Sequence, residues 1–414
     1  MTNRIERLIS EVETALDARF RAIESRALYL QEKALNAFRN NRVAARHFAP
    51  TNGYGYDDAG RDTLCRIYAE VFEAQSAVVS PHIINGTHAI ALALFGVLRP
   101  GGLLLSVTGT PYDTLKNVIS GKNNGSLADF GVKFRKVELA DLGDGQAPDY
   151  AAVTRALREK PPAAVFIQRS RGYAWRRALT LAEIEKLIAC VKSVCDVPVI
   201  VDNCYGEFVE DREPTAVGAD LIAGSLIKNP GGGLAPSGGY IAGKAAYVDA
   251  AAGRLTVPGI GMAAGSYDAS YRPFYQGFFM APHTVSQAMK TAALFCGAFS
   301  RLGYETLPKT GEGGGDIIAS VKFAQKEELL AFCREIQKSA PVDGFVTPEP
   351  WDMPGYNHQV IMAAGTFVQG ASIELSADSP VKEPYIAYLQ GSLTYEHGKI
   401  ALKNCLNAID RERK

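Results

Sequence analysis

The sequence lacks an excess of charge of either sign, because its 414 residues contain 44 Lys or Arg and 44 Asp or Glu. This balance argues against nucleic acid or an anionic membrane as a main partner. No apolar run approaches the ~18 residues of a membrane-spanning helix, and residues 1–20 contain no apolar core of a signal peptide. We therefore expect a cytoplasmic protein that binds a small molecule.

Cysteine and histidine are sparse, and their spacing is uninformative. The seven cysteines are an odd number without a C-x-x-C pair, which argues against a disulfide framework and a zinc site. The six histidines show no metal-ligand spacing such as H-E-x-x-H. We therefore expect reduced thiols and no catalytic metal.

The chain is otherwise ordinary for a soluble globular protein, with 47% hydrophobic and 21% charged residues. Its length suggests two domains of about 100–200 residues each. Apolar residues at helical spacing predict one helix over 5–23 and a second over 28–38. A region rich in Gly, Asp and Asn follows, and a helix is expected to resume near residue 62.

Short apolar runs then alternate with helical stretches. Such alternation predicts a largely parallel sheet, so residues 52–285 are expected to form a large α/β domain. Residues 286–414 predict a smaller α+β domain, and residues 1–51 a helical segment that packs with it or with a partner subunit. The expected strands lie at 76–80, 103–108, 163–168, 197–202, 220–224, 238–243, 360–367 and 371–377, and the last helices at 323–340 and 393–409.

Two charged residues follow neighbouring predicted strands. Asp202 ends the strand 197–202, and Lys228 follows the strand 220–224. Ligands of open α/β sheets bind beyond the carboxyl ends of the strands. Pyridoxal phosphate needs a lysine that forms an imine and an acid that faces its pyridinium nitrogen, so the two residues fit this cofactor. An ordinary ion pair at a strand end explains them equally well.

Further polar residues occupy equivalent positions. Asn85, Gly86 and Thr87 follow the strand 76–80 and precede a long helical run, where free backbone N–H groups suit a phosphate. Ser225 offers a hydroxyl three residues before the lysine. Tyr112 follows the strand 103–108 and could stack on a planar ring. Taken alone, the first motif also fits a plain helix cap, and the tyrosine also fits a core or rim position.

Together these motifs resemble fold-type I pyridoxal-phosphate enzymes of the cystathionine and methionine lyase group. The chain is most similar to the methionine gamma-lyase-like family that is also called aluminum resistance protein. Matching stretches spread from about residue 47 to 399 and include NGTHAI, GTPYDTL, VDNCYGEF and GSLIKNPGGG. The resemblance implies a large domain with a mostly parallel seven-stranded sheet, a smaller α+β domain, and pyridoxal 5'-phosphate as the cofactor.

The resemblance also implies roles for individual residues. Lys228 resembles the lysine that binds the cofactor and removes a proton from the substrate. Tyr112 resembles the tyrosine that stacks on the ring and moves protons. The remaining expected cofactor contacts are Asp202 at the ring nitrogen, Cys204 under the ring, and Asn85, Gly86, Thr87 and Ser225 around the phosphate.

The related lyases share each active site between two chains. A tyrosine and an arginine reach the phosphate from the neighbouring subunit, and Tyr56 and Arg61 are the best matches, with Tyr54 as a poorer substitute for the tyrosine. We therefore expect a homodimer or a homotetramer.

The sequence departs from the lyases at the substrate site. The arginine that holds the substrate carboxylate through two parallel hydrogen bonds has no clear counterpart. Arg169, Arg171 and Lys382 are the candidates, although a structural ion pair explains each of them as well. The strand-end loop that supplies an asparagine in the lyases reads QRSRGY here.

The expected activity is carbon–sulfur bond cleavage, by β- or γ-elimination, in a sulfur-containing amino acid. Lys228 is the expected base, because a neutral lysine in a desolvated pocket is competent to remove the α-proton. Three alternatives remain open. They are another reaction on the same cofactor, such as transamination, racemisation or aldol cleavage; a non-catalytic protein that keeps the cofactor pocket; and a cofactor-free α/β protein that binds phosphate through GSLIKNPGGG.

Overall fold

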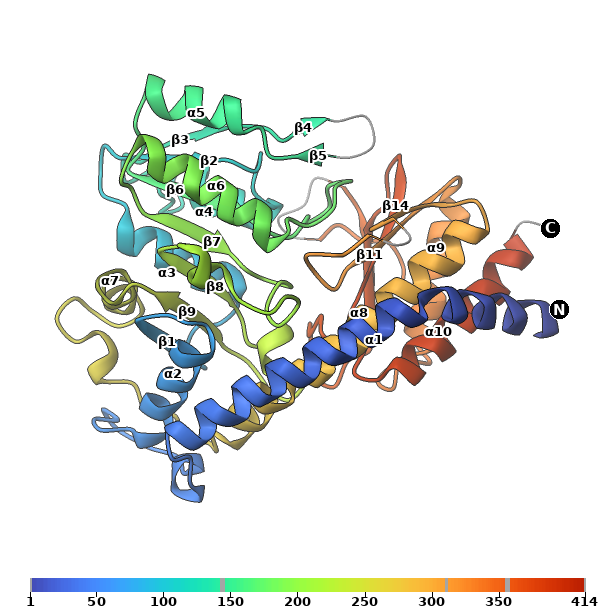
Figure 1. The fold of residues 1–414 in the computed structure, drawn as a ribbon, viewed down its shortest axis with the longest axis horizontal. Coiled ribbons are helices and arrows are strands. Elements are labelled where there is room, and N and C mark those ends of the chain that lie inside the picture. The colour runs from blue at the N-terminus through green and yellow to red at the C-terminus, as the bar shows by residue number, and fades with distance from the viewer. Residues whose placement is uncertain (1, 142–145, 310–311, 354–357, 413–414) are drawn as a thin grey trace.

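The structure is a computed structural model that describes residues 2–141, 146–309, 312–353 and 358–412 (Figure 1). Its large domain contains a seven-stranded sheet with the order β1-β9-β8-β7-β6-β2-β3. The five strands from β8 to β3 are parallel, whereas β9 runs antiparallel to both β8 and β1. This is the mostly parallel sheet that the resemblance implies. The strands are β1 (Ser76–Ser80), β2 (Leu103–Ser106), β3 (Lys133–Lys136), β6 (Ala164–Gln168), β7 (Val199–Asp202), β8 (Leu221–Ser225) and β9 (Gly239–Gly243).

Helices cover both faces of this sheet, which explains why its central strands are apolar throughout. Neighbouring residues of a strand point to opposite faces, so that Ile200 packs with α3 and α7 while Val199 and Val201 pack with α2, α5 and α6. The helices are α2 (Ala59–Val71), α3 (Gly86–Val97), α4 (Asp113–Ser120), α5 (Tyr150–Glu159), α6 (Leu181–Val194) and α7 (Ala245–Leu255).

The small domain contains a five-stranded antiparallel sheet with the order β10-β11-β14-β13-β12. Its helices bury a second core against this sheet. The elements are β10 (Glu305–Leu307), β11 (Ala319–Phe323), α9 (Lys326–Lys338), β12 (Val360–Ala363), β13 (Ser376–Pro380), β14 (Tyr385–Gln390) and α10 (Tyr395–Glu412).

Two long helices, α1 (Thr2–Asn40) and α8 (Arg272–Arg301), lie against each other and join the two domains (Figure 1). The start of α1 packs in the small-domain core through Ile5 and Val12, and its end packs in the large-domain core through Leu30. The predicted helices 5–23 and 28–38 are therefore one helix, because no Pro or Gly interrupts the stretch between them. The expected boundary at residue 285 lies inside α8.

The structure differs from the sequence prediction in three further respects. Residues 371–375 are not a strand, because the Glu374 carboxylate accepts hydrogen bonds from the N–H groups of Phe367 and Val368 and closes a turn there. The sequence reading also missed β3, β10, β11 and β14, of which β3 lies partly exposed at the sheet edge. It missed the short ladder of β4 (Ala140–Asp141) and β5 (Gln146–Ala147) as well.

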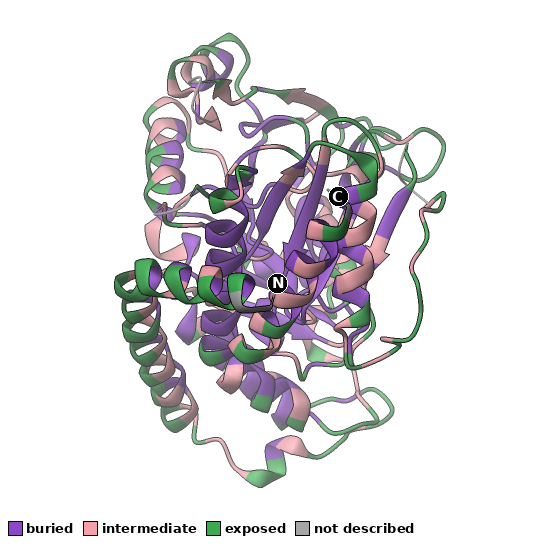
Figure 2. Cartoon of the chain, turned by 90° about the vertical axis from the view of Figure 1, so that its right-hand side faces the viewer, coloured by how far each residue is buried: buried purple, intermediate pink, exposed green. Residues whose placement is uncertain are grey.

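The burial pattern follows these layers. Figure 2 shows that the strands in the interior are buried, whereas the outer helices alternate between exposed and buried faces. The short 3-10 helices are η1 (Ala45–Phe48), η2 (Pro214–Val217), η3 (Asn229–Gly231) and η4 (Gly261–Ala263). Within the described ranges, no helix combines the length and apolar character needed to cross a lipid bilayer.

Candidate active site

A cavity of about 310 Å³ lies where the carboxyl ends of β6, β7 and β8 face the small-domain strands β13 and β14. Ligands of open α/β sheets bind at this edge. The cavity is lined from three directions: by the large-domain strand ends, by the start of α3 and α4, and by the small sheet. Most of the residues predicted from the sequence to bind a cofactor line this one cavity.

Lys228 and Asp202 lie at the floor of the cavity. Asp202 is the last residue of β7, and Cys204 N donates a hydrogen bond to its Oδ1 at 3.1 Å. Burial raises the pKa of Asp202, while the charge of Lys228 opposes that change. Lys228 follows β8 and precedes η3, so that the two side chains come from neighbouring parallel strands, as the sequence predicts.

The surroundings of Lys228 favour its charged form. Burial lowers the pKa of this amine, whereas the charge of the Asp202 carboxylate raises it. Burial also raises the pKa values of Cys204 and Tyr205, so these two groups keep their protons at neutral pH. The Asp202 carboxylate is therefore the charge that acts on Lys228.

The start of α3 forms a small cup next to Lys228. Asn85 caps the helix, because its Oδ1 accepts a hydrogen bond from His88 N at 2.8 Å. A Cβ on Gly86 would lie 3.1 Å from Cys204 Sγ and 3.4 Å from Ser225 Cβ, so the glycine keeps this corner open. The Ser225 hydroxyl is buried and has no hydrogen-bond partner among the described residues. A buried hydroxyl without a partner is costly unless a ligand satisfies it.

Tyr112 closes the side of this cup. Its hydroxyl lies 2.9 Å from Thr87 Oγ1, and its backbone N–H donates to Gln168 Oε1 at 2.9 Å. Burial raises the pKa of Tyr112 far above its usual value, so the hydroxyl is neutral. Gln168 ends β6 and begins the QRSRGY segment, and no sequence motif predicted its place in the cavity.

The small domain supplies a wall that the sequence reading did not predict. Asp378 of β13 lies opposite Tyr388 of β14, and Gln390 Nε2 donates to Asp378 Oδ1 at 2.9 Å. The Tyr173 hydroxyl also hydrogen-bonds to this carboxylate. Burial raises the pKa of Asp378 to about 6. The only local signal for this wall is a set of polar residues in short strands of the C-terminal domain.

The three residues predicted to hold the substrate carboxylate do not line the cavity. Arg169 is fully buried and bonds to Asn203 Oδ1 and Glu210 Oε1. Arg171 is equally buried and pairs with Asp316 at 3.1 Å. Lys382 is exposed on the turn between β13 and β14. Both guanidinium groups are thus already paired with acids, which corrects the expectation that they bind a substrate.

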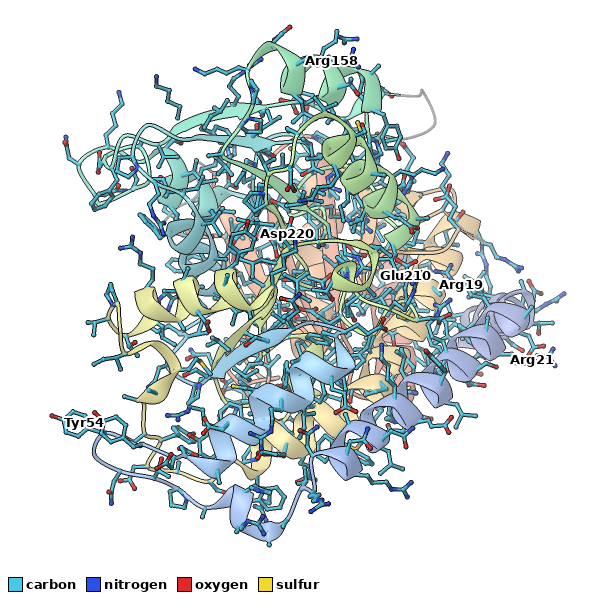
Figure 3. All side chains as sticks on the ribbon, turned by 60° about the vertical axis from the view of Figure 1, so that its left-hand side comes forward. Arg19, Arg21, Tyr54, Arg158, Glu210 and Asp220 are labelled. Carbon is cyan, nitrogen blue, oxygen red and sulfur yellow. The ribbon has the colours of Figure 1, made fainter. Side chains whose placement is uncertain are left out.

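The residues predicted to reach another subunit lie outside this cavity. Tyr54 and Tyr56 are 74% and 60% exposed, and their rings stack with centroids 5.4 Å apart. Figure 3 shows Tyr54 projecting from the periphery of the molecule. Arg61 is buried beneath them, where Nη1 donates to the Gly55 and Gly265 carbonyls. Arg61 therefore shapes the loop that presents the two tyrosines.

The cavity fits pyridoxal phosphate chemically. A lysine and a buried acid share its floor. Beside them lies an open helix N-terminus with a buried hydroxyl that no described residue contacts by a hydrogen bond. Helix N-termini favour phosphate because their N–H groups are free. The sequence reading missed Tyr205, Gln168, Tyr173, Asp378, Tyr388 and Gln390 among the lining residues.

Comparisons with known proteins find similar chains and similar folds. A family model described as methionine gamma-lyase matches residues 5–410. The uncharacterized protein YnbB of Bacillus subtilis is 49% identical over 98% of this chain and 96% of its own. A crystal structure from Clostridium acetobutylicum, of a protein named as a candidate cystathionine beta-lyase involved in aluminum resistance, superposes with a TM-score of 0.94 at 47% identity and covers 98% and 96% of the two chains.

A more distant structure shares the fold alone. The pyridoxal-5'-phosphate dependent protein YhfS from Escherichia coli is 17% identical, with a TM-score of 0.62 and coverage of 95% of this chain and 97% of its own. The chain thus has the fold of type I pyridoxal-phosphate enzymes, as expected from the sequence.

Proposed function

The chain belongs to the methionine gamma-lyase family, and we propose on this premise that it binds pyridoxal 5'-phosphate and cleaves a carbon–sulfur bond in a sulfur-containing amino acid. The observation that carries the proposal is the cavity floor, where the buried Asp202 ends β7 and Lys228 follows the neighbouring strand β8. Beside them lies the Ser225 hydroxyl, which has no hydrogen-bond partner among the described residues. An ordinary structural ion pair would not need an open helix N-terminus and an unpaired hydroxyl next to it.

The residues of the cavity suit separate parts of the cofactor. Lys228 would bond to its aldehyde carbon, and Asp202 would face its ring nitrogen. Tyr112 would stack on one face of its ring. Gly86, Thr87 and Ser225 would hold the phosphate, and Cys204 would lie under the ring. When bound, pyridoxal phosphate supplies an electron sink for the negative charge that develops on the substrate α-carbon.

The chain's own groups supply the proton transfers. Lys228 is the proposed base for the α-proton, because a neutral amine in a desolvated pocket is competent to accept it. Tyr112 keeps its proton at neutral pH and is the proposed donor to the departing sulfur, held in place by Thr87. The buried Asp202 carboxylate is the proposed partner of a positive ring nitrogen. The small domain covers one side of the cavity and limits the access of water to these groups.

We further propose that two chains share the site in a homodimer or homotetramer. The exposed ring pair of Tyr54 and Tyr56 supports this proposal, because large exposed aromatic side chains are enriched at protein interfaces. Tyr56 is the proposed contact to the phosphate in the partner's site. Arg61 is proposed to hold the loop that carries Tyr56, through its hydrogen bonds to the Gly55 and Gly265 carbonyls.

Chemical trapping tests the cofactor assignment directly. The purified chain is incubated with pyridoxal phosphate, reduced with borohydride and digested, and its peptides are mapped by mass spectrometry. We expect a pyridoxyl adduct on Lys228, and absence of that adduct would overturn the proposal. A panel of sulfur amino acids then identifies the reaction, because elimination gives a keto acid and ammonia, whereas racemisation gives an amino acid of inverted configuration.

A further inference from the structure

A buried polar cluster lies behind the turn that carries Lys228. Glu207 and Asn229 are both completely buried, and Asn229 Nδ2 donates a hydrogen bond to Glu207 O at 2.9 Å. The Tyr240 hydroxyl of β9 donates to Glu207 Oε1 at 2.8 Å. Since Asn229 directly follows Lys228, this cluster connects the turn after β7 with the turn after β8.

The fold leaves space for the Glu207 carboxyl against β8. Gly224 of β8 pairs with Tyr240 of β9 across the sheet. A Cβ on Gly224 would lie 2.5 Å from Glu207 Oε1 and 2.6 Å from Tyr240 Cε1, so a side chain here would displace both groups. Ser225, the next residue, points to the opposite face and lines the cavity. The Glu207 carboxyl therefore lies behind the cavity floor.

Two oxygen atoms of this cluster lack a hydrogen-bond donor in the described part of the chain. They are Glu207 Oε2 and Asn229 Oδ1, and both are buried. A buried acceptor without a donor is costly. A proton on Oε2 turns this oxygen into a donor, and Asn229 already contacts the same residue through Nδ2. One hydrogen bond from Oε2 to Oδ1 would satisfy both atoms, whereas an ionised Glu207 leaves both without a partner.

The charges around Glu207 also favour the neutral acid. Burial, then the charge of Glu213, raises the pKa of Glu207 to about 8, although the Tyr240 hydroxyl, the Glu207 N–H and the charge of Lys228 oppose the change. Arg169 lies in the same region, but its guanidinium is already paired with two other acids. The further titratable groups that act on this carboxyl are a thiol and a phenol that burial keeps protonated, Cys204 and Tyr68.

We propose that Glu207 is a positioning residue for Lys228. As a neutral acid it donates from Oε2 to Asn229 Oδ1 and holds the turn that carries the lysine. When the acid loses its proton, this hydrogen bond is lost, and the new negative charge favours the ammonium form of Lys228, which is not nucleophilic. The inference rests on the proposed function only because it takes Lys228 as the reactive amine.

Labelling of Lys228 at different pH values tests the inference in the full-length, cofactor-free chain. A small acylating reagent attacks only the neutral amine, and peptide mass analysis measures the modified fraction. Glu207→Gln keeps a donor and an acceptor but cannot ionise. Its labelling should equal that of wild type at pH 6.5. At pH 9.5, where wild type carries the extra charge, the variant should label about threefold or more faster.

Glu210→Gln is the matched control for the pH dependence. Glu210 belongs to the same loop, but its carboxylate is paired with Arg169. Its replacement should change the labelling of Lys228 by one constant factor across this pH range. A ratio of Glu207→Gln to wild type that is equally constant would overturn the inference.

Cofactor binding at pH 6.5 tests the hydrogen bond to Asn229. Glu207→Met has a side chain of similar length without a strong donor or acceptor, and it should weaken pyridoxal phosphate binding about tenfold, whereas Glu207→Gln should bind like wild type. If Glu207→Met does not fold, infrared spectroscopy takes its place. Wild type should then show a protonated carboxyl band at pH 6.5 that Glu207→Gln removes. Full affinity of Glu207→Met, or absence of this band, would contradict the role of Glu207.

Trapping on Lys228 separates this failure from that of the proposed function. A chain that yields the pyridoxyl adduct but shows a constant labelling ratio refutes only the role of Glu207. A chain without the adduct refutes the proposed function, and the labelling comparison in the cofactor-free chain still decides whether Glu207 controls the amine.

Discussion

The Lys228 ammonium nitrogen lies 4.0 Å from the centre of the Tyr205 ring. This distance is within the range of a cation–π interaction, which stabilises the charged amine. Tyr205 adopts a φ of +71°, a conformation that few residues other than glycine adopt. The turn after Asp202 therefore places an aromatic face beneath the lysine at some conformational cost.

Removing this ring is expected to make Lys228 more reactive. In the cofactor-free chain, Tyr205→Leu should lower the pKa of the lysine, since a cation–π contact contributes about 1 kcal/mol. That loss corresponds to roughly fivefold more neutral amine near pH 8. Labelling of Lys228 by an amine-directed reagent, followed by peptide mass analysis, measures the change. Tyr205→Phe keeps the ring face and should label like wild type, and equal labelling of the two variants would contradict the prediction.

Ser225→Ala is expected to have opposite effects on stability and cofactor binding. Without cofactor, the variant loses a buried hydroxyl that has no hydrogen-bond partner in the described part of the chain, and its free energy of unfolding should rise by about 1 kcal/mol. Its affinity for pyridoxal phosphate should fall, because a proposed phosphate donor is lost. Denaturant unfolding and a cofactor absorbance titration measure the two effects.

Ser106→Ala is the matched control for Ser225. Ser106 is also a buried serine at the end of a large-sheet strand, but its hydroxyl donates to Gly109 O at 2.6 Å. Its removal should destabilise the cofactor-free chain. If both variants lost the same free energy of unfolding, the conclusion that the Ser225 hydroxyl lacks a hydrogen-bond partner among the described residues would be wrong.

The ion pair of Arg171 and Asp316 joins the β6 loop to the small domain and is expected to be structural. Both side chains are fully buried, so Asp316→Asn leaves an unpaired guanidinium and should cost about 3–5 kcal/mol. The midpoint of guanidinium unfolding measures the loss. Glu305→Gln breaks the exposed pair with Lys322 and should cost below about 1 kcal/mol. Similar effects of the two changes would argue against this role.

The floor of the site could be read from the sequence, whereas its opposite wall could not. Lys228, Asp202 and Tyr112 each follow an apolar run, and parallel strands bring their carboxyl ends to one edge by geometry alone. Asp378 reaches the same cavity only because α1 and α8 fix the small domain against the large one. The sequence suggested Arg171 as a substrate-binding residue, because its ion-pair partner Asp316 lies 145 residues away in the chain and could not be recognised.

Glu207 is expected to make stability fall as pH rises. Burial, then the nearby Glu213 charge, raises the pKa of Glu207 to about 8, so the folded chain holds this proton at neutral pH while the unfolded chain releases it. Stability from the protonated acid is present at low pH and is lost as the pH rises through 8. Glu207→Gln mimics the protonated form. The difference in free energy of unfolding between this variant and wild type should therefore shift in favour of the variant by about 3 kcal/mol from pH 5 to pH 8. Unfolding midpoints across this range measure the difference, and a gap independent of pH would contradict it.

Tyr56 provides the test of a shared site, because it is exposed and can be changed without disturbing the core. If Tyr56 binds the partner's phosphate, Tyr56→Ala should weaken cofactor binding about tenfold, as expected for a hydrogen bond to a charged group. Tyr54→Ala removes the stacked neighbour and should have a smaller effect. Mixing Tyr56→Ala chains with Lys228→Ala chains should then raise activity above that of the separate preparations, because a mixed oligomer contains one site with both residues. No gain on mixing would mean that each chain builds its site alone.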